Sequence, residues 1–267
     1  MINQELVNFS NRLADLSQEI AKKYFRLPNG EITKEDDTPV THADREIEKI
    51  IRAEIEKKFP THGIIGEEFG VKKSASDFTW ILDPIDGTSS FIVGRPIFGT
   101  LIALSFQGKV VLGVMNQPIN GERWIGIDDG SEKSGAWLNG KKIHTRKCPE
   151  LSNAVLSACS PFFFKDGDEK FFEKISRQTK YQKIGGVIYG GDCYSYACLA
   201  SGFIDLIIDP GLKVYDYAAL LPIIRMAGGV VTDWQGNDPK LQSNVRLVAA
   251  GDKKLHQRVL EILNGEN

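Results

Sequence analysis

A run of apolar residues at 80–82 leads directly into two aspartates, Asp83 and Asp86, in the segment WILDPIDGT. Two carboxylates held this close repel each other unless a cation neutralises them or one of them binds a proton. Oxygen ligands of this kind suit Mg²⁺, which also takes phosphate oxygens as ligands. Gly87 and Thr88 add backbone N–H groups that could bind a phosphate. The segment favours a metal and phosphate site, although DPxDG strings also form ordinary turns.

Two other acidic segments are ambiguous when each is taken alone. Glu67 and Glu68 follow the short apolar run at 64–65, and such a pair is compatible with a solvated loop. Asp216 opens a predicted helix, where an aspartate often serves only as an N-cap. The three acidic segments become informative together, because a metal site needs carboxylates that converge from different parts of the chain.

The three motifs in this order resemble the inositol monophosphatase family of Mg²⁺-dependent, Li⁺-sensitive phosphatases, and the resemblance spans nearly the whole chain. The motifs are GEE at 66–68, WILDPIDGTSSF at 80–91 and YDYAALLPIIRMAGG at 215–229. Tyr215 stands where the family usually has Trp, and Ser89-Ser90 replaces the commoner Thr-Asn or Lys-Ser. Neither departure removes a metal ligand, but both could alter the shape of the pocket.

The resemblance implies a set of ligands for two to three Mg²⁺ ions. Glu67, Asp83 and the backbone carbonyl of Ile85 would bind the first ion. Asp83, Asp86 and Asp216 would bind the second, and a third, weaker ion would depend on Glu67 through water. This implied set leads us to expect one metal centre built from three separate segments.

The resemblance also implies the catalytic residues, which are Asp44, Thr88 and Glu67. Asp44 and Thr88 would orient and deprotonate the attacking water. Gly87 and Thr88 would bind the phosphate, and Glu68 would support the ligands from behind. No covalent intermediate on the enzyme is required by these residues.

The second half of the chain is expected to select the substrate. Three strings look most like the histidinol-phosphate phosphatase branch of the family: GRPIFGTLIAL at 94–104, NQPINGERWIG at 116–126 and GGDCYSYA at 190–197. Asp209 falls at the acidic position that contacts substrate hydroxyls in the family, and the segment of Asp192 falls where many relatives carry Gly-Thr-Ala. Two carboxylates beside a phosphate pocket would suit the amine and imidazole of histidinol phosphate. Asp192 could equally serve as a helix N-cap.

The predicted activity is hydrolysis of L-histidinol phosphate to L-histidinol and phosphate, a step of histidine synthesis. An inositol-1-phosphatase or a broader sugar-phosphate phosphatase is the alternative within the same class of enzyme. A non-catalytic binding protein is a third hypothesis, since some relatives also bind transcription machinery. It is disfavoured, because every expected carboxylate is present.

Composition agrees with a small-molecule enzyme. The chain has 267 residues, with 33 Lys+Arg against 35 Asp+Glu, and this balance gives no global attraction to nucleic acid or anionic lipid. No run of about 18 apolar residues predicts a membrane span, and residues 1–10 lack the pattern of a secretory signal. The four cysteines show no metal-ligand spacing and favour free thiols in the cytosol. We therefore expect a cytoplasmic enzyme acting on a phosphate ester, and the resemblance implies a homodimer.

Apolar periodicity predicts the elements that must position these residues. An amphipathic helix is expected over 5–26, closed by Pro28-Asn29-Gly30, and a second helix from an N-cap at Thr41 to Pro60. Strands are expected at 79–83, 97–106, 109–115 and 122–127, with a hairpin turn at Asn139-Gly140. The first half therefore reads as two helices followed by an antiparallel sheet.

Helices and strands alternate in the second half. Strands are predicted at 153–159, 204–208, 230–233 and 245–250, and helices at 168–179, 192–201, 216–227 and 253–263. The order predicts a layered α/β fold, and the resemblance implies an αβαβα sandwich. A boundary near 146–152 would separate an N-terminal half, 1–148, with most metal ligands from a C-terminal half, 149–267, with Asp216 and the substrate residues.

Overall fold

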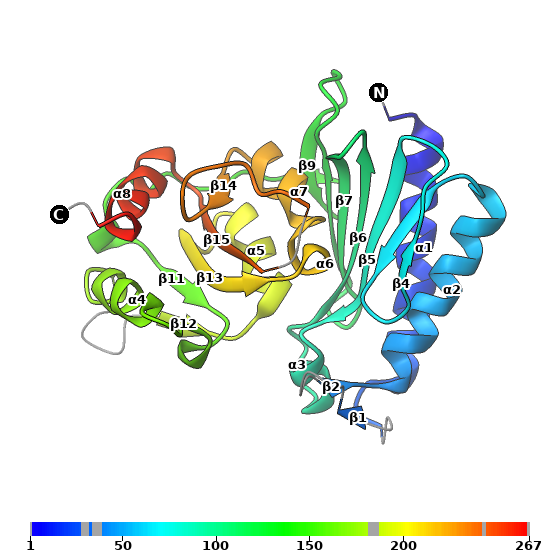
Figure 1. The fold of residues 1–267 in the computed structure, drawn as a ribbon, viewed down its shortest axis with the longest axis horizontal. Coiled ribbons are helices and arrows are strands. Elements are labelled where there is room, and N and C mark those ends of the chain that lie inside the picture. Colours follow the sequence, from blue (N-terminus) through cyan, green and yellow to red (C-terminus); the bar gives the residue numbers. More distant parts are fainter. Residues whose placement is uncertain (1, 28–31, 34–38, 181–186, 242–243, 266–267) are drawn as a thin grey trace.

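The chain folds into alternating layers of helix and sheet in the computed structural model, which describes residues 2–27, 32–33, 39–180, 187–241 and 244–265. One helical pair, an eight-stranded sheet, a central helical layer, a five-stranded sheet and a second helical pair follow one another across the molecule (Figure 1). The predicted αβαβα sandwich is confirmed. The predicted helix stop at Pro28-Asn29-Gly30 lies outside the described residues.

The eight-stranded sheet comes from the first half of the chain. It is antiparallel except where β3 pairs parallel with β5, so the prediction of a purely antiparallel sheet is corrected there. Its order is β10-β9-β8-β7-β6-β5-β3-β4. The strands are β3 (Gly63–Gly66), β4 (Gly70–Lys72), β5 (Phe78–Asp86), β6 (Gly99–Phe106), β7 (Lys109–Gln117), β8 (Glu122–Ile127), β9 (Gly135–Leu138) and β10 (Lys141–Lys142).

The five-stranded sheet comes from the second half, in the order β12-β11-β13-β15-β14. Its strands are β11 (Leu156–Ala158), β12 (Val187–Tyr189), β13 (Leu206–Leu212), β14 (Val230–Asp233) and β15 (Val245–Ala250). A separate two-stranded ribbon pairs β1 (Ile32–Thr33) with β2 (Pro39–Val40). The two large sheets fall on either side of the predicted boundary, and the division into two halves stays a prediction.

Helices cover both sheets and fill the space between them (Figure 1). The outer pair α1 and α2 packs on the eight-stranded sheet, α5, α6 and α7 lie between the sheets, and α4 and α8 cover the far side. The helices are α1 (Gln4–Tyr24), α2 (His42–Lys58), α3 (Thr88–Ile92), α4 (Asp168–Ser176), α5 (Asp192–Ala200), α6 (Val214–Tyr217), α7 (Leu220–Met226) and α8 (Lys253–Leu263). Among the described residues, none of these helices combines the length and apolar content that a membrane span needs.

Local sequence explains where α2 begins. The Thr41 hydroxyl accepts the backbone N–H of Ala43, and the Asp44 carboxylate accepts the backbone N–H of Thr41, which together form a capping box. The predicted N-cap is therefore confirmed. Asp44, a predicted catalytic residue, is fixed in place by the same hydrogen bonds.

The predicted helix over 216–227 is wrong in one respect, because it divides into α6 and α7 on either side of Ala218-Ala219. Pro222 explains the break, since proline has no N–H to donate and is tolerated only in the first turn of a helix. The break places Asp216 in the short helix α6 and leaves α7 free to pack against β7 and β8.

Candidate active site

A cavity of about 420 Å³ collects most of the residues singled out in the sequence. Its walls come from the end of β5, the start of α3, the start of α5, the end of β13 and helix α6. Nine of the eleven predicted site residues line it: Glu67, Asp83, Ile85, Asp86, Gly87, Thr88, Asp192, Asp209 and Asp216. Asp44 and Glu68 are not among the lining residues.

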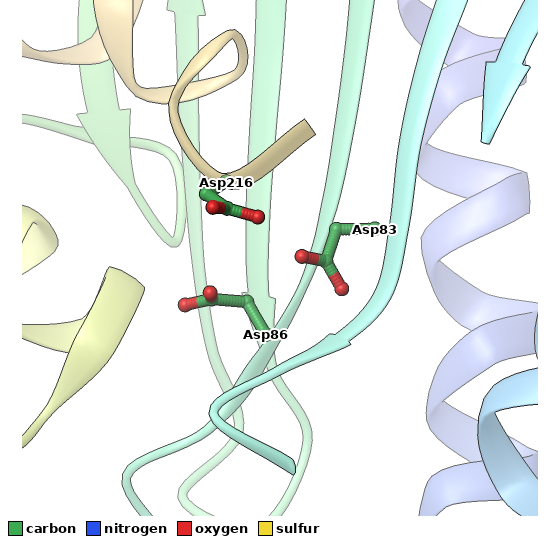
Figure 2. Close-up of side chains that lie close together, drawn as sticks. All are labelled: Asp83, Asp86 and Asp216. Carbon is green, nitrogen blue, oxygen red and sulfur yellow. The ribbon is translucent and has the colours of Figure 1, made fainter. Parts of the chain in front are cut away.

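Three of the predicted metal ligands converge in this cavity. Asp83, Asp86 and Asp216 each offer a carboxylate oxygen, and these oxygens lie within 4.8 Å of one another. Figure 2 shows the three side chains gathered around one space, two from β5 and one from the segment that crosses above it. Strand β5 of the eight-stranded sheet and helix α6 thus contribute jointly to one acidic cluster.

A β-bulge explains why Asp83 and Asp86 point the same way. Residues three apart in a regular strand project to opposite faces of a sheet. Here Asp83 pairs with Leu101 and Asp86 pairs with Gly99, so β5 holds one residue more than β6 over the same interval. An extra residue of this kind turns the side chain that follows it. The bulge therefore brings both carboxylates to the same side.

Asp216 reaches the cluster from the first turn of α6. One of its carboxylate oxygens accepts the backbone N–H of Lys213 at 2.8 Å, so the residue does help to cap the helix. The carboxylate also faces Asp83 and Asp86 (Figure 2). The capping role and the cluster role thus coexist in one side chain.

The cluster is electrostatically unfavourable without a cation. Burial, together with the charges of Glu67, Asp86, Asp216 and Asp44, raises the pKa of Asp83 well above its ordinary value. Oδ1 of Asp83 is buried and has no hydrogen-bond partner among the described residues. A buried carboxylate oxygen without a partner, facing other carboxylates, fits the oxygen-ligand set that a hard divalent cation such as Mg²⁺ prefers.

Thr88 lines the cavity and contacts Asp44, which lies behind it. The Asp44 carboxylate accepts hydrogen bonds from the Thr41 hydroxyl at 2.5 Å and, more weakly, from the Thr88 hydroxyl at 3.5 Å. The Thr88 hydroxyl can instead donate to the carbonyl of Ile85 at 3.0 Å. Burial raises the pKa of Asp44 to about 7, against the opposing effect of the Thr41 hydrogen bonds. A carboxylate with this pKa can accept a proton near neutral pH.

The alternative that Asp192 serves as a helix N-cap is wrong. The N-cap of α5 is Gly191, and no side chain caps it, whereas Asp192 is the first helical residue. One carboxylate oxygen of Asp192 lies 2.8 Å from the position that a Cβ on Gly87 would occupy. Gly87 has φ 84°, so both its backbone and its crowded neighbour require glycine there.

Asp209 is held by internal hydrogen bonds. Its carboxylate accepts the Cys159 backbone N–H at 3.0 Å and the Tyr196 hydroxyl at 2.8 Å, and it is almost fully buried. Burial nevertheless raises its pKa to about 6. Asp192 is only partly buried, and burial raises its pKa while a hydrogen bond with Cys159 and the charge of Arg95 oppose that rise.

Several cavity residues were missed by the sequence reasoning. The backbone N–H of Cys193 donates to Asp86 at 2.5 Å, and Cys159 contacts Asp209 through its backbone and its thiol. Both cysteines are free thiols, as predicted, but their backbones orient the acidic residues. The position of Cys193 directly after Asp192 could have indicated that it lies at the site. Its hydrogen bond could not be predicted, because any residue type can supply a backbone N–H.

The metal-free protein is expected to lose thermal stability as the pH rises. Asp44 and Asp216 have pKa values raised to about 7 mainly by burial, and folding therefore favours their protonated forms. The two protonated carboxyl groups contribute fully to the free energy of unfolding below their ordinary pKa of 3.8. This contribution is lost as the pH rises from there through about 7.

Calorimetry in a chelator between about pH 5 and pH 8 should show a falling Tm, and added Mg²⁺ should reduce the fall. The Asp216→Asn variant should show a shallower decline than the unsubstituted protein. A chelated Tm that rises steadily across this range would contradict the expectation.

Comparison with known proteins agrees with this geometry. The model of the inositol monophosphatase family matches residues 2–266. The protein named bifunctional phosphatase IMPL2, chloroplastic, of Arabidopsis thaliana is 46% identical over 262 residues, covering 95% of this chain and 73% of that protein. A histidinol-phosphatase of Chlorobaculum parvum is 34% identical, covering 95% of both chains.

A solved structure supports the same family. The structure of an inositol monophosphatase from Zymomonas mobilis superposes with a TM-score of 0.86 at 39% identity, covering 98% of both chains. The phosphatases named in these comparisons are phosphoric monoester hydrolases, and the family depends on metal ions, generally Mg²⁺. With a family match over almost the full length and an acidic cluster in its cavity, this chain belongs to the inositol monophosphatase family and is a phosphatase.

Proposed function

We propose that this phosphatase hydrolyses L-histidinol phosphate to L-histidinol and phosphate. The observation that carries the proposal is Asp192, a partly buried carboxylate in the same cavity as the acidic cluster. A substrate with a phosphate at one end and a protonated amine at the other can contact both groups at once. The 34% identity to the histidinol-phosphatase of Chlorobaculum parvum, over 95% of this chain, supports the same substrate.

The acidic residues of the cavity would hold the metal ions. Glu67, Asp83, the Ile85 carbonyl, Asp86 and Asp216 are the proposed ligands of two to three Mg²⁺ ions. Bound there, the ions would neutralise the phosphate, lower the pKa of a bound water and stabilise the leaving oxygen. The protein positions these ligands in advance, through the bulge in β5 and the first turn of α6.

The chain's own groups would handle the proton and the phosphate. Asp44 is proposed to accept the proton of the attacking water through the Thr88 hydroxyl, which it already contacts. The backbone N–H groups of Gly87 and Thr88 are proposed to bind the phosphate, and Glu68 to support Glu67. Catalysis would then consist mainly of positioning and charge stabilisation.

Asp192 and Asp209 are proposed to have different tasks. Asp209 already accepts bonds from Tyr196 and from Cys159, so its capacity for a substrate is largely used. Asp192 is more exposed and also contacts the Cys159 side chain. We therefore propose that Asp192 binds the cationic end of the substrate. Asp209 would instead fix Cys159 and Tyr196 in the wall of the cavity.

A substrate panel tests the proposal. Phosphate release from histidinol phosphate, inositol-1-phosphate and a sugar phosphate should be measured with Mg²⁺ and with a chelator. We expect Mg²⁺-dependent release with the highest kcat/KM for histidinol phosphate. The 39% identity to the inositol monophosphatase from Zymomonas mobilis makes inositol-1-phosphate the second candidate, and a clear preference for it would replace the proposed substrate.

Replacing Asp192 with Asn should lower kcat/KM for histidinol phosphate by about 10- to 100-fold, the usual effect of losing a hydrogen bond to a charged group. The loss should be smaller for inositol-1-phosphate, because its leaving group is uncharged. Steady-state kinetics on both substrates give the comparison. Equal losses on the two would mean that Asp192 acts on the metal site, where its charge also raises the pKa of Asp86.

A homodimer, a cytoplasmic location and a place in histidine synthesis complete the proposal. Sedimentation equilibrium would test the dimer directly. Complementation of a histidine-requiring strain that lacks its histidinol-phosphatase would test the pathway, and failure of an expressed, active protein to restore growth would argue against it.

A further inference from the structure

The segment that carries Glu67 is held from two sides. On one side, β3 pairs with β5 as far as Gly66 and Leu82, and the backbone N–H of Glu67 donates to the Leu82 carbonyl at 3.3 Å. On the other side, the next two backbone N–H groups, of Glu68 and Phe69, donate to a single side chain of helix α2, that of Glu48, at 2.7 and 3.2 Å. Glu67 is therefore fixed between β5 and α2.

Glu48 is a buried carboxylate with a full set of partners. Its side chain is 0% exposed, and its Oε1 also accepts a hydrogen bond from Nε of Arg52 at 2.7 Å. Arg52 in turn donates to the carbonyl of Gly70, at the far end of the same turn. A buried charge is stable only when it is paired and hydrogen-bonded. Two of the partners of Glu48 are backbone N–H groups of the Glu67 turn, and the third, Arg52, is itself hydrogen-bonded to that turn.

Gly66 gives independent evidence that Glu48 and this turn are fitted to each other. A Cβ on Gly66 would overlap Oε1 of Glu48 and approach Nη2 of Arg52 to 2.8 Å. The backbone of Gly66 is ordinary β-strand and lies outside the left-handed region, so its conformation does not require glycine. The glycine of the GEE motif is required by the carboxylate of Glu48.

Helix α2 thus supplies two acidic side chains from one face. Glu48 lies four residues after Asp44, and residues at this spacing are neighbours on a helix surface. Both are buried, yet Asp44 contacts Thr88 while Glu48 contacts the turn that carries Glu67. A shift of α2 would therefore move Asp44 and the turn at residues 66–69 together.

We propose that Glu48 is a positioning residue that fixes the Glu67 carboxylate for metal binding. The inference rests on the proposed role of Glu67 as a metal ligand. Residues that orient a ligand from behind typically change metal affinity by about 10- to 100-fold when they are replaced. Glu48 does not line the cavity, so its effect is exerted through the turn at residues 66–69.

The test is a direct measurement of Mn²⁺ affinity, by the EPR signal of free Mn²⁺, on the intact protein without substrate. Glu48→Gln keeps the size of the side chain, but its amide NH₂ would face a backbone N–H or Arg52, and the turn should loosen. We expect Mn²⁺ affinity to fall about 10- to 100-fold, with a matching rise in the Mg²⁺ concentration for half-maximal activity and a smaller change in kcat.

Glu54→Gln is the matched control. It lies on the same helix and pairs with an arginine, Arg12, at 2.8 Å, and within the described part of the chain it has no hydrogen bond or ion pair with the turn. Its Mn²⁺ affinity should equal that of the unsubstituted protein. Should Glu48→Gln fold poorly, Glu48→Asp keeps the charge and the Arg52 partner while withdrawing the oxygens, and the same loss of affinity is expected.

A double-substitution cycle separates positioning from general damage. Gly66→Ala alone should weaken Mn²⁺ binding through its clash with Glu48, and in the Glu48→Asp background, where the carboxylate is retracted, it should cost less. Additive losses, or a folded Glu48→Gln protein with unchanged Mn²⁺ affinity, would overturn the inference.

Glu67→Gln distinguishes failure of this inference from failure of the proposed site. If Glu67→Gln weakens Mn²⁺ binding while Glu48→Gln does not, only the positioning role is wrong. If Glu67→Gln leaves Mn²⁺ affinity unchanged, Glu67 is no ligand, and the proposed metal site and the role of Glu48 fall together.

Discussion

Replacing Asp86 with Asn is expected to lower kcat/KM for phosphate release by about 1000-fold or more. Asp86 belongs to the carboxylate cluster that would hold the metal, and a bound metal contributes several kcal/mol of charge stabilisation in the transition state, which corresponds to about three powers of ten in rate. The amide keeps one oxygen that can accept the Cys193 N–H, so the local backbone should be preserved. The measurement is steady-state kinetics at saturating Mg²⁺.

The same substitution should raise the thermal stability of the metal-free protein. Burial, Asp192 and Asp216 raise the pKa of Asp86 well above its ordinary value, so its charge opposes folding at neutral pH. A neutral amide removes that cost, and the chelated variant should unfold at a higher Tm than the unsubstituted protein. Added Mg²⁺ should then stabilise the variant less. Lower activity together with higher stability is typical of a substitution at a functional site.

Asp129→Asn provides the control for the Asp86 variant. Burial opposes its ionisation, but hydrogen bonds from Ser131, Ile2 and Ser134 outweigh that effect and lower the pKa of Asp129 to about 2, so its charge favours folding. This variant should lose stability at neutral pH and retain full activity. An Asp86→Asn enzyme with an unchanged rate would refute the proposed site.

The fold was predictable where periodicity and end signals agree. The apolar stripe of α1 and the Thr41 cap of α2 are both found, as are the strands β5 to β8 and the turn at Asn139-Gly140. Strands β1 to β4 and β12 were missed. β3 is bounded by two glycines, which weaken a strand pattern, and β12 has only three residues, two of them exposed.

The acidic residues were predictable, but their arrangement was not. Asp83 and Asp86 share a face only because β5 carries a bulge opposite Leu101 and Gly99, and that register depends on how β6 pairs. Glu48 and Arg52 show the same limit. At a spacing of four residues they read as an ordinary surface ion pair, and only the packing of α2 on the eight-stranded sheet buries Glu48 against the Glu67 turn.

Replacing Asp44 with Asn is expected to lower kcat by about 100- to 10,000-fold, the usual contribution of a positioned general base. Asp44 contacts the Thr88 hydroxyl and has a pKa raised to about 7 by burial, so it can take a proton from the nucleophile near neutral pH. Asn can still accept the Thr41 N–H and preserve the start of α2. Kinetics across pH should show that the activity gained by ionisation of Asp44 is absent from the variant.

Thr41→Ala separates catalysis from helix capping. It removes the side-chain cap and one partner of Asp44, and should cost about 1 kcal/mol of stability while Asp44 keeps its contact with Thr88. Its loss of activity should be far smaller than that of Asp44→Asn. Thr88→Ala should instead lose as much as Asp44→Asn, and the double variant little more, because the two residues would act on the same proton. If Thr41→Ala is as inactive as Asp44→Asn, Asp44 serves the helix and the attacking water is activated elsewhere.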